Sequence, residues 1–165
     1  MDERITDAFY QAYVGEAKAS LRLKVFADKA EQEGYLPMAK LFRAIARSEE
    51  IHGERCLRML KEIKSTEENL KASFESEVQV AGVAYEEFIK LAAEGEDETA
   101  GTIFSQSRDV EDGHSKLYKE AMNHLMEERE TTYYICGTCG YISDGVLPDE
   151  CPVCGADKEE FLKFD

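Results

Sequence analysis

Two Glu-x-x-His units are the residues of this chain whose types and spacing most clearly suggest chemistry. They are the segments Glu49–His52 and Glu111–His114, and they contain two of the chain's only three histidines. Residues i and i+3 share one helix face, so each unit can present a carboxylate and an imidazole to one metal ion. A single unit of this kind is usually part of a solvated helix face. The residues around each unit therefore decide whether a metal site is the better interpretation.

Both units lie on apolar helix stripes. Helical spacing from Glu49 gives Phe42, Ile45, Ala46, Gly53, Cys56 and Leu60. The same spacing from Glu111 gives Phe104, Ser107, Tyr118 and Met122. An isolated buried carboxylate is costly, so an acid on such a stripe must be paired, protonated or bound to metal. Few positively charged side chains share these stripes. Ion pairing is therefore not the easy explanation, and a bound metal ion is favoured.

Two other helical segments each add one carboxylate. Glu16 interrupts the apolar face of residues 2–33, and Glu77 interrupts that of residues 66–94. One Glu from each of two helices plus a Glu-x-x-His from each of two others is the ligand set of ferritin-like di-iron and di-manganese bundles. Oxygen and imidazole donors suit iron or manganese.

Helix start and stop signals define the elements that must position these ligands. Gly34 and Pro37 indicate a stop and a restart, and Ser65 with Glu68 is a capping-box signature. Gly95 ends the third helix, and the fourth is expected over residues 99–130. These lengths predict an all-α, antiparallel four-helix bundle over residues 1–130.

The composition changes in residues 131–165, which carry two Cys-x-x-Cys hooks. The four cysteines are Cys136, Cys139, Cys151 and Cys154. This spacing is a strong signal for a tetrathiolate metal site, and so short a segment needs metal to stay folded. We expect its aromatic residues to pack over the metal as a small core: Tyr133, Tyr134, Tyr141, Phe161 and Phe164.

The spacing alone leaves the occupant of the hooks open, because zinc ribbons use the same pattern and disulfides are another alternative. The chain begins Met-Asp-Glu-Arg without an apolar targeting segment, and Cys56 makes the number of cysteines odd. We therefore expect a reduced, cytoplasmic protein without disulfides. A net charge of -15 disfavours nucleic acid and anionic membranes as partners.

Together these motifs resemble those of rubrerythrins, in which a ferritin-like di-iron bundle precedes a rubredoxin-like iron domain. The similarity spans essentially the whole chain and rests on the two Glu-x-x-His units and on the cysteine hooks. Tyr141 after the first hook and Pro152 within the second are similar to rubredoxin. The resemblance therefore implies iron, rather than zinc, in the four-cysteine site, and a small β/loop domain around it.

The resemblance also implies a role for each ligand of the bundle. Glu49 and Glu111 would bridge two irons, while His52 and His114 would supply one nitrogen each. Glu16 would be the terminal carboxylate ligand of the iron that His52 binds. Glu77 would be the terminal carboxylate ligand of the iron that His114 binds.

One position departs from the family pattern. Rubrerythrins typically carry a second glutamate three residues after the one that matches Glu77, and one iron moves between it and the histidine with redox state. Here that residue is Val80, which cannot bind metal, so the resemblance implies that the iron next to Glu16 stays with His52 in both states. Glu75 and Glu86 do not share the face of Glu77, so neither is a convincing replacement.

The activity implied by the resemblance is reduction of hydrogen peroxide to water by a di-iron peroxidase, linked to NADH through rubredoxin or its reductase, in protection against oxidative stress. It also implies a homodimer in which one chain's rubredoxin domain lies near the partner's di-iron site. Two alternatives remain. One is a ferritin-like ferroxidase, oxidase or iron-handling protein, although iron storage needs no attached thiolate relay. The other is a non-enzymatic binding module with a zinc ribbon.

Overall fold

The computed structural model describes residues 1–123 and 131–164. The chain divides into two compact units, Met1–Lys64 and Ser65–Asp165, and each is described by itself. Within the described residues, no helix is long and apolar enough to span a membrane.

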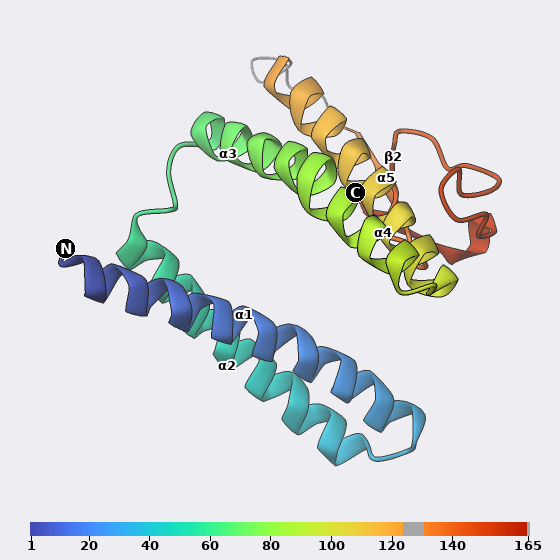
Figure 1. The fold of residues 1–165 in the computed structure, drawn as a ribbon. Coiled ribbons are helices and arrows are strands. Elements are labelled where there is room, and N and C mark those ends of the chain that lie inside the picture. The colour runs from blue at the N-terminus through green and yellow to red at the C-terminus, as the bar shows by residue number, and fades with distance from the viewer. Residues whose placement is uncertain (124–130, 165) are drawn as a thin grey trace. The chain divides into compact units, whose positions relative to one another are not determined.

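The first unit is a hairpin of two long helices, α1 (Glu3–Gln32) and α2 (Leu36–Leu60). The chain reverses between them at Gly34, whose φ of 82° is accessible to glycine at little cost, and Pro37 stands in the first turn of α2. Figure 1 shows the two helices running side by side in opposite directions. Small residues are buried in this hairpin, which lets the helices approach closely: Ala27, Ala30, Ala39, Ala46 and Gly53.

The second unit begins with the predicted capping box. The Ser65 hydroxyl accepts from the Glu68 N–H, and the Glu68 side chain accepts from the Ser65 N–H. The helix expected over residues 66–94 forms with the right ends, but it has three parts. α3 (Thr66–Gln79) and α4 (Tyr85–Glu94) are joined by the π-helical turn η1 (Val80–Ala84).

Helix α5 (Glu98–Asn123) packs along α3, η1 and α4. Tyr85, Phe88 and Phe104 form an aromatic cluster in this packing, with ring centroids 5.5 to 6.4 Å apart. The predicted continuation to residue 130, and His124 within it, fall outside the described residues.

The cysteine-rich tail forms a three-stranded antiparallel sheet in the order β2-β1-β3. Its strands are β1 (Tyr133–Cys136), β2 (Ile142–Asp144) and β3 (Phe161–Phe164), and a short 3-10 helix, η2 (Lys158–Glu160), leads into β3. The predicted aromatic core forms only in part. Tyr133 and Phe164 face each other across the outer ends of β1 and β3, where both are exposed, whereas Tyr134, Tyr141 and Phe161 are partly buried.

Candidate metal centres

The first unit brings together Glu16 from α1 with Glu49 and His52 from α2. The Nδ1 atom of His52 lies 3.0 Å from Glu49 Oε2 and 3.8 Å from Glu16 Oε1. Each of the three residues offers one ligand atom, and these atoms lie within 4.8 Å of one another. Gly53 lies beside Glu16, since a Cβ at that position would be in ordinary contact with the Cβ of Glu16, at 3.7 Å. The i, i+3 spacing on α2 thus brings Glu49 and His52 together, as predicted, and Glu16 from α1 adds the third member of the group.

The second unit repeats the arrangement with Glu77 from α3 and with Glu111 and His114 from α5. The Nδ1 atom of His114 lies 2.9 Å from Glu111 Oε2, and the three ligand atoms again fall within 4.8 Å. The other ring nitrogen, Nε2, is buried and has no hydrogen-bond partner among the described residues. We refer to the two groups as the first triad and the second triad.

Electrostatics in both triads favours a bound cation. A hydrogen bond with Glu49, then burial and the negative charge of Glu49, raise the pKa of the Glu16 carboxyl above its ordinary value. Burial and the charge of Glu111 raise the pKa of Glu77 in the same way. Facing carboxylates beside an imidazole are the oxygen and nitrogen donors that iron and manganese prefer. The residues present therefore fit a metal ion in each triad.

The inward orientation expected for the ligands is only partly observed. The side chains of Glu49 and Glu111 are 24% and 23% exposed, and that of His114 is 23% exposed. The side chain of His52 is 48% exposed. Ala46 and Gly53 of the predicted stripe are buried, and the orientation of His52 toward the core of a four-helix bundle stays a prediction.

Val80 begins the π-helical turn, one helical turn beyond Glu77. Among the described residues, the second triad has no fourth carboxylate. Glu75 is 3.9 Å from Lys71, and Glu86 is 3.1 Å from Arg108, so both acids have partners elsewhere. A π turn is common at functional sites, and no sequence periodicity signals it.

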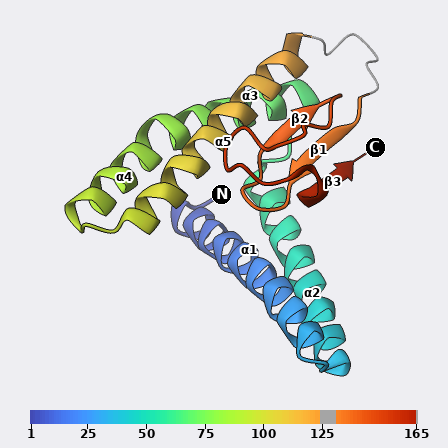
Figure 2. The same ribbon diagram turned by 90° about the vertical axis from the view of Figure 1, so that its right-hand side faces the viewer.

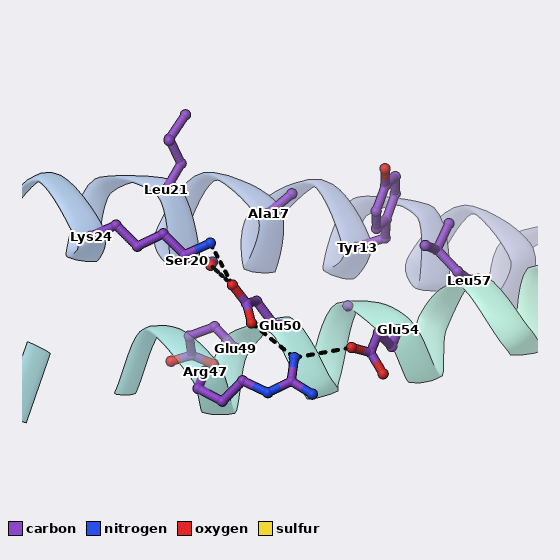
Figure 3. A pocket seen from close by; sticks show the side chains of 11 residues that line it. Tyr13, Ala17, Ser20, Leu21, Lys24, Arg47, Glu49, Glu50, Glu54 and Leu57 are labelled. Carbon is purple, nitrogen blue, oxygen red and sulfur yellow. Dashed lines mark hydrogen bonds and ion pairs between the residues drawn. The ribbon is translucent and has the colours of Figure 1, made fainter. Parts of the chain in front are cut away.

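An ion-pair network beside the first triad was not anticipated from the sequence. Glu50 lies 2.5 Å from Lys24 Nζ and 2.8 Å from Arg47, and Arg47 also reaches Glu54 at 3.1 Å. These groups line a groove of about 330 Å³ between α1 and α2, shown in Figure 3. The hydrogen bonds from Lys24 and Arg47 lower the pKa of Glu50 to about 2.

Within residues 1–123 and 131–164, no lysine or arginine forms an ion pair with Glu49. Both nearby cations are paired with Glu50, and the ion-pair partner of Glu49 within the described part of the chain is His52. The i, i+3 spacing of Arg47 and Glu50 is the one sequence signal for part of this network.

The four cysteines of the tail converge as the hook spacing predicts. Their sulfur atoms all lie within 4.8 Å of one another, and the closest pairs are 3.6 and 3.7 Å apart. These distances exceed a disulfide bond of about 2.05 Å, and the cysteines are free thiols. The arrangement therefore fits one metal ion held by four sulfurs.

Backbone N–H groups support this sulfur site. Burial raises the pKa of the Cys136 thiol, but hydrogen bonds from the N–H groups of Cys139 and Thr138 outweigh it and bring the pKa to about 7. Burial also raises the pKa of Cys139 and Cys154. The N–H donors stabilise thiolate sulfur, which is the form that binds metal.

Comparison with known proteins agrees with this geometry. Residues 7–122 match the family described as Rubrerythrin, and residues 134–162 match the rubrerythrin rubredoxin-like domain. Rubrerythrin-2 of Clostridium acetobutylicum is 29% identical, over 96% of this chain and 95% of that protein. Nigerythrin of Nitratidesulfovibrio vulgaris is 27% identical, over 93% and 83%.

Among solved structures, nigerythrin in its mixed-valence state is similar, with a TM-score of 0.60 and 26% identity over 96% of this chain and 86% of that one. The predicted fold class, a ferritin-like helical domain followed by a small strand domain, is confirmed by these matches. The predicted cofactors, a di-iron centre and one iron in a four-cysteine site, are those of the matched domains and fit the clusters described above. The chain belongs to the rubrerythrin family.

Proposed function

We propose that this protein is a non-haem di-iron peroxidase that reduces hydrogen peroxide to water with electrons delivered through its four-cysteine tail. One observation carries the proposal: a single chain holds two carboxylate and imidazole triads together with a tetrathiolate site. Such a combination provides a metal pair for substrate and a separate one-electron centre. An iron-storage protein has no need of the second centre.

The site residues take the roles that the family resemblance implies. Glu16 and His52 would hold one iron, Glu77 and His114 the other, and Glu49 and Glu111 would bridge them. The bound irons supply Lewis acidity and two electrons for the O–O bond. The carboxylates offset the charge of the metal ions, and the imidazoles complete their coordination.

The tail would act as the relay. Cys136, Cys139, Cys151 and Cys154 would hold one iron, and the N–H groups that reach their sulfurs would tune its reduction potential. Each peroxide needs two electrons and two protons, so the relay would act twice for every pair of water molecules formed. The external donor in this proposal is a reduced rubredoxin or its NADH-linked reductase.

The test is a single turnover. The fully reduced, oxygen-free protein is mixed rapidly with one equivalent of hydrogen peroxide, and the visible absorption of the ferric thiolate site is followed. Fast return of this colour with peroxide, and slow return with oxygen, is the expected result. Fast return with oxygen only would contradict the proposal and assign the site to an oxidase or a ferroxidase.

Metal analysis provides a second test of the proposed function. The proposal requires about three irons per chain, two from the triads and one from the tail. Zinc in the tail of the active protein would remove the electron path and contradict the relay.

A further inference from the structure

A carboxylate lies beside the second cysteine hook. This hook, with Cys151 and Cys154, belongs to the segment between β2 and η2 of the tail, and Figure 2 shows the strands of the tail in orange and red. Glu150 precedes Cys151 in the chain. Its Oε1 atom lies only 3.3 Å from the position that a Cβ on Gly155, the residue after Cys154, would take. The Glu150 side chain therefore extends from the start of the hook to its end.

Backbone hydrogen bonds hold Glu150 and Gly155 next to the hook. The Gly155 N–H donates to the Cys151 carbonyl over 2.9 Å, and the Cys151 N–H donates to the Ala156 carbonyl over 2.8 Å. Glu150 also forms an antiparallel bridge with Asp157. Gly155 has a φ of 74°, which glycine adopts readily, and its lack of a side chain leaves room for the carboxylate. The position of Glu150 is therefore set by the fold of the hook.

The charge of Glu150 is not neutralised by a neighbouring side chain. Within residues 1–123 and 131–164, no lysine, arginine or histidine forms an ion pair with it. The side chain is exposed, and a carboxylate in contact with water is ionised at neutral pH. Asp149, the preceding residue, is also exposed but does not approach Gly155. Glu150 therefore brings an unpaired negative charge to the hook.

An unpaired negative charge at this position acts on the metal site through space. Reduction of iron held by four thiolates adds one negative charge to the centre, whose potential depends on net charge, hydrogen bonds and exposure. A nearby carboxylate repels the added charge and so favours the ferric form. The N–H groups that reach the sulfurs of Cys136 and Cys154 act in the opposite direction, because they stabilise negative charge on sulfur. Solvent screens an exposed charge, so the effect of Glu150 is modest.

We propose that Glu150 tunes the tail iron to a lower reduction potential through its charge. The step that it affects is a one-electron reduction, in which the external donor converts ferric tail iron to ferrous and no bond to Glu150 forms or breaks. A lower potential makes the ferrous tail a stronger electron donor to a di-iron site and a weaker acceptor from the external donor. That consequence rests on the proposed peroxidase function, whereas the potential itself depends only on the iron bound in the tail.

The test is a potentiometric titration of the whole, iron-loaded protein without oxygen or peroxide, followed through the ferric thiolate colour. Glu150→Gln removes the charge and keeps the shape of the side chain. It should raise the equilibrium constant for reduction about threefold, or about 28 mV, since a tenfold change in a one-electron equilibrium corresponds to about 59 mV. Asp149→Asn is the matched control, because it removes a charge next to the hook without a contact to Gly155, and it should shift the potential less. Equal shifts in the two variants, or no shift in Glu150→Gln, would overturn the proposal.

Two further measurements separate the charge of Glu150 from its shape. Glu150→Lys reverses the charge and should shift the potential about twice as far as Glu150→Gln, in the same direction. High salt should reduce the difference between Glu150→Gln and the unchanged protein. A Glu150→Lys shift no larger than that of Glu150→Gln, or a difference that salt leaves unaffected, would overturn the electrostatic origin.

The iron content and the ferric thiolate spectrum should be the same in all these variants, which shows that the four-cysteine site is intact. The titration contains no peroxide. A failure of the proposed peroxidase function would therefore leave the measured potentials unchanged, and the two failures are distinct.

Discussion

The first triad, on α1 and α2, and the second triad, on α3 and α5, contain the same residue types at the same helical spacing, yet their surroundings differ. His52 is half exposed, and the neighbouring cations are paired with Glu50. His114 is largely buried, with one ring nitrogen unpartnered among the described residues, and Val110 next to it contacts the tail. Residues of the same types at the same spacing therefore have different neighbours in the two units.

The largest expected effect comes from removing the relay. Cys139→Ser should abolish turnover with an external donor, because the tail is too short to hold a metal-free core. The helical content should stay close to that of the unchanged protein, since neither helical hairpin depends on the tail cysteines. Circular dichroism, iron content and peroxide consumption measure the three outcomes. Unimpaired turnover would mean that the tail is not the relay.

Loss of a bridging carboxylate should have the next largest effect. Glu111→Ala should leave a folded protein that cannot hold two metals in its triads, because Glu77 and His114 alone provide too few donors. Metal content per chain is the measurement. Glu75→Ala is the control, since Glu75 is exposed and pairs with Lys71. Full occupancy in the Glu111→Ala protein would contradict the ligand assignment.

Val80→Glu would sharpen the comparison by restoring the carboxylate that the family resemblance implies at this position, beside Glu77 and for the iron served by His52. A carboxylate one helical turn from Glu77 should slow iron release to a chelator several-fold, since helical spacing places both acids on one face. Val83→Glu, at an exposed position of the same π turn, is the matched control. Equal release rates in the two variants would mean that the π turn directs residue 80 away from the metal.

The smallest expected effect concerns the first triad. Glu50→Gln should free Lys24 and Arg47 to approach Glu49 and compete with metal, which should lower iron occupancy modestly at limiting iron. Glu54→Gln removes the other contact of Arg47 but leaves Glu50 paired, so it should change occupancy less. If both variants bind iron like the unchanged protein, the network acts only in packing α1 against α2.

The sequence by itself predicted the residues of the two triads, the cysteine hooks and the helix ends that lie within residues 1–123. Glu49 with His52, Glu111 with His114, and the capping box at Ser65 are encoded within one or two helical turns. Local backbone geometry fixes such spacings, so they can be read without knowledge of the rest of the fold. Glu16 and Glu77 were also identified, because each interrupts an otherwise apolar stripe.

Only the tertiary structure decided the surroundings of these groups. Lys24 meets Glu50 across α1 and α2, and Gly140 meets Val110 across the tail and α5. Neither pair is marked by any local spacing, because contacts between residues so distant in sequence depend on how elements pack. The π turn at Val80 and the exposure of His52 have the same origin. Periodicity indicates which face a residue lies on, whereas packing decides what covers that face.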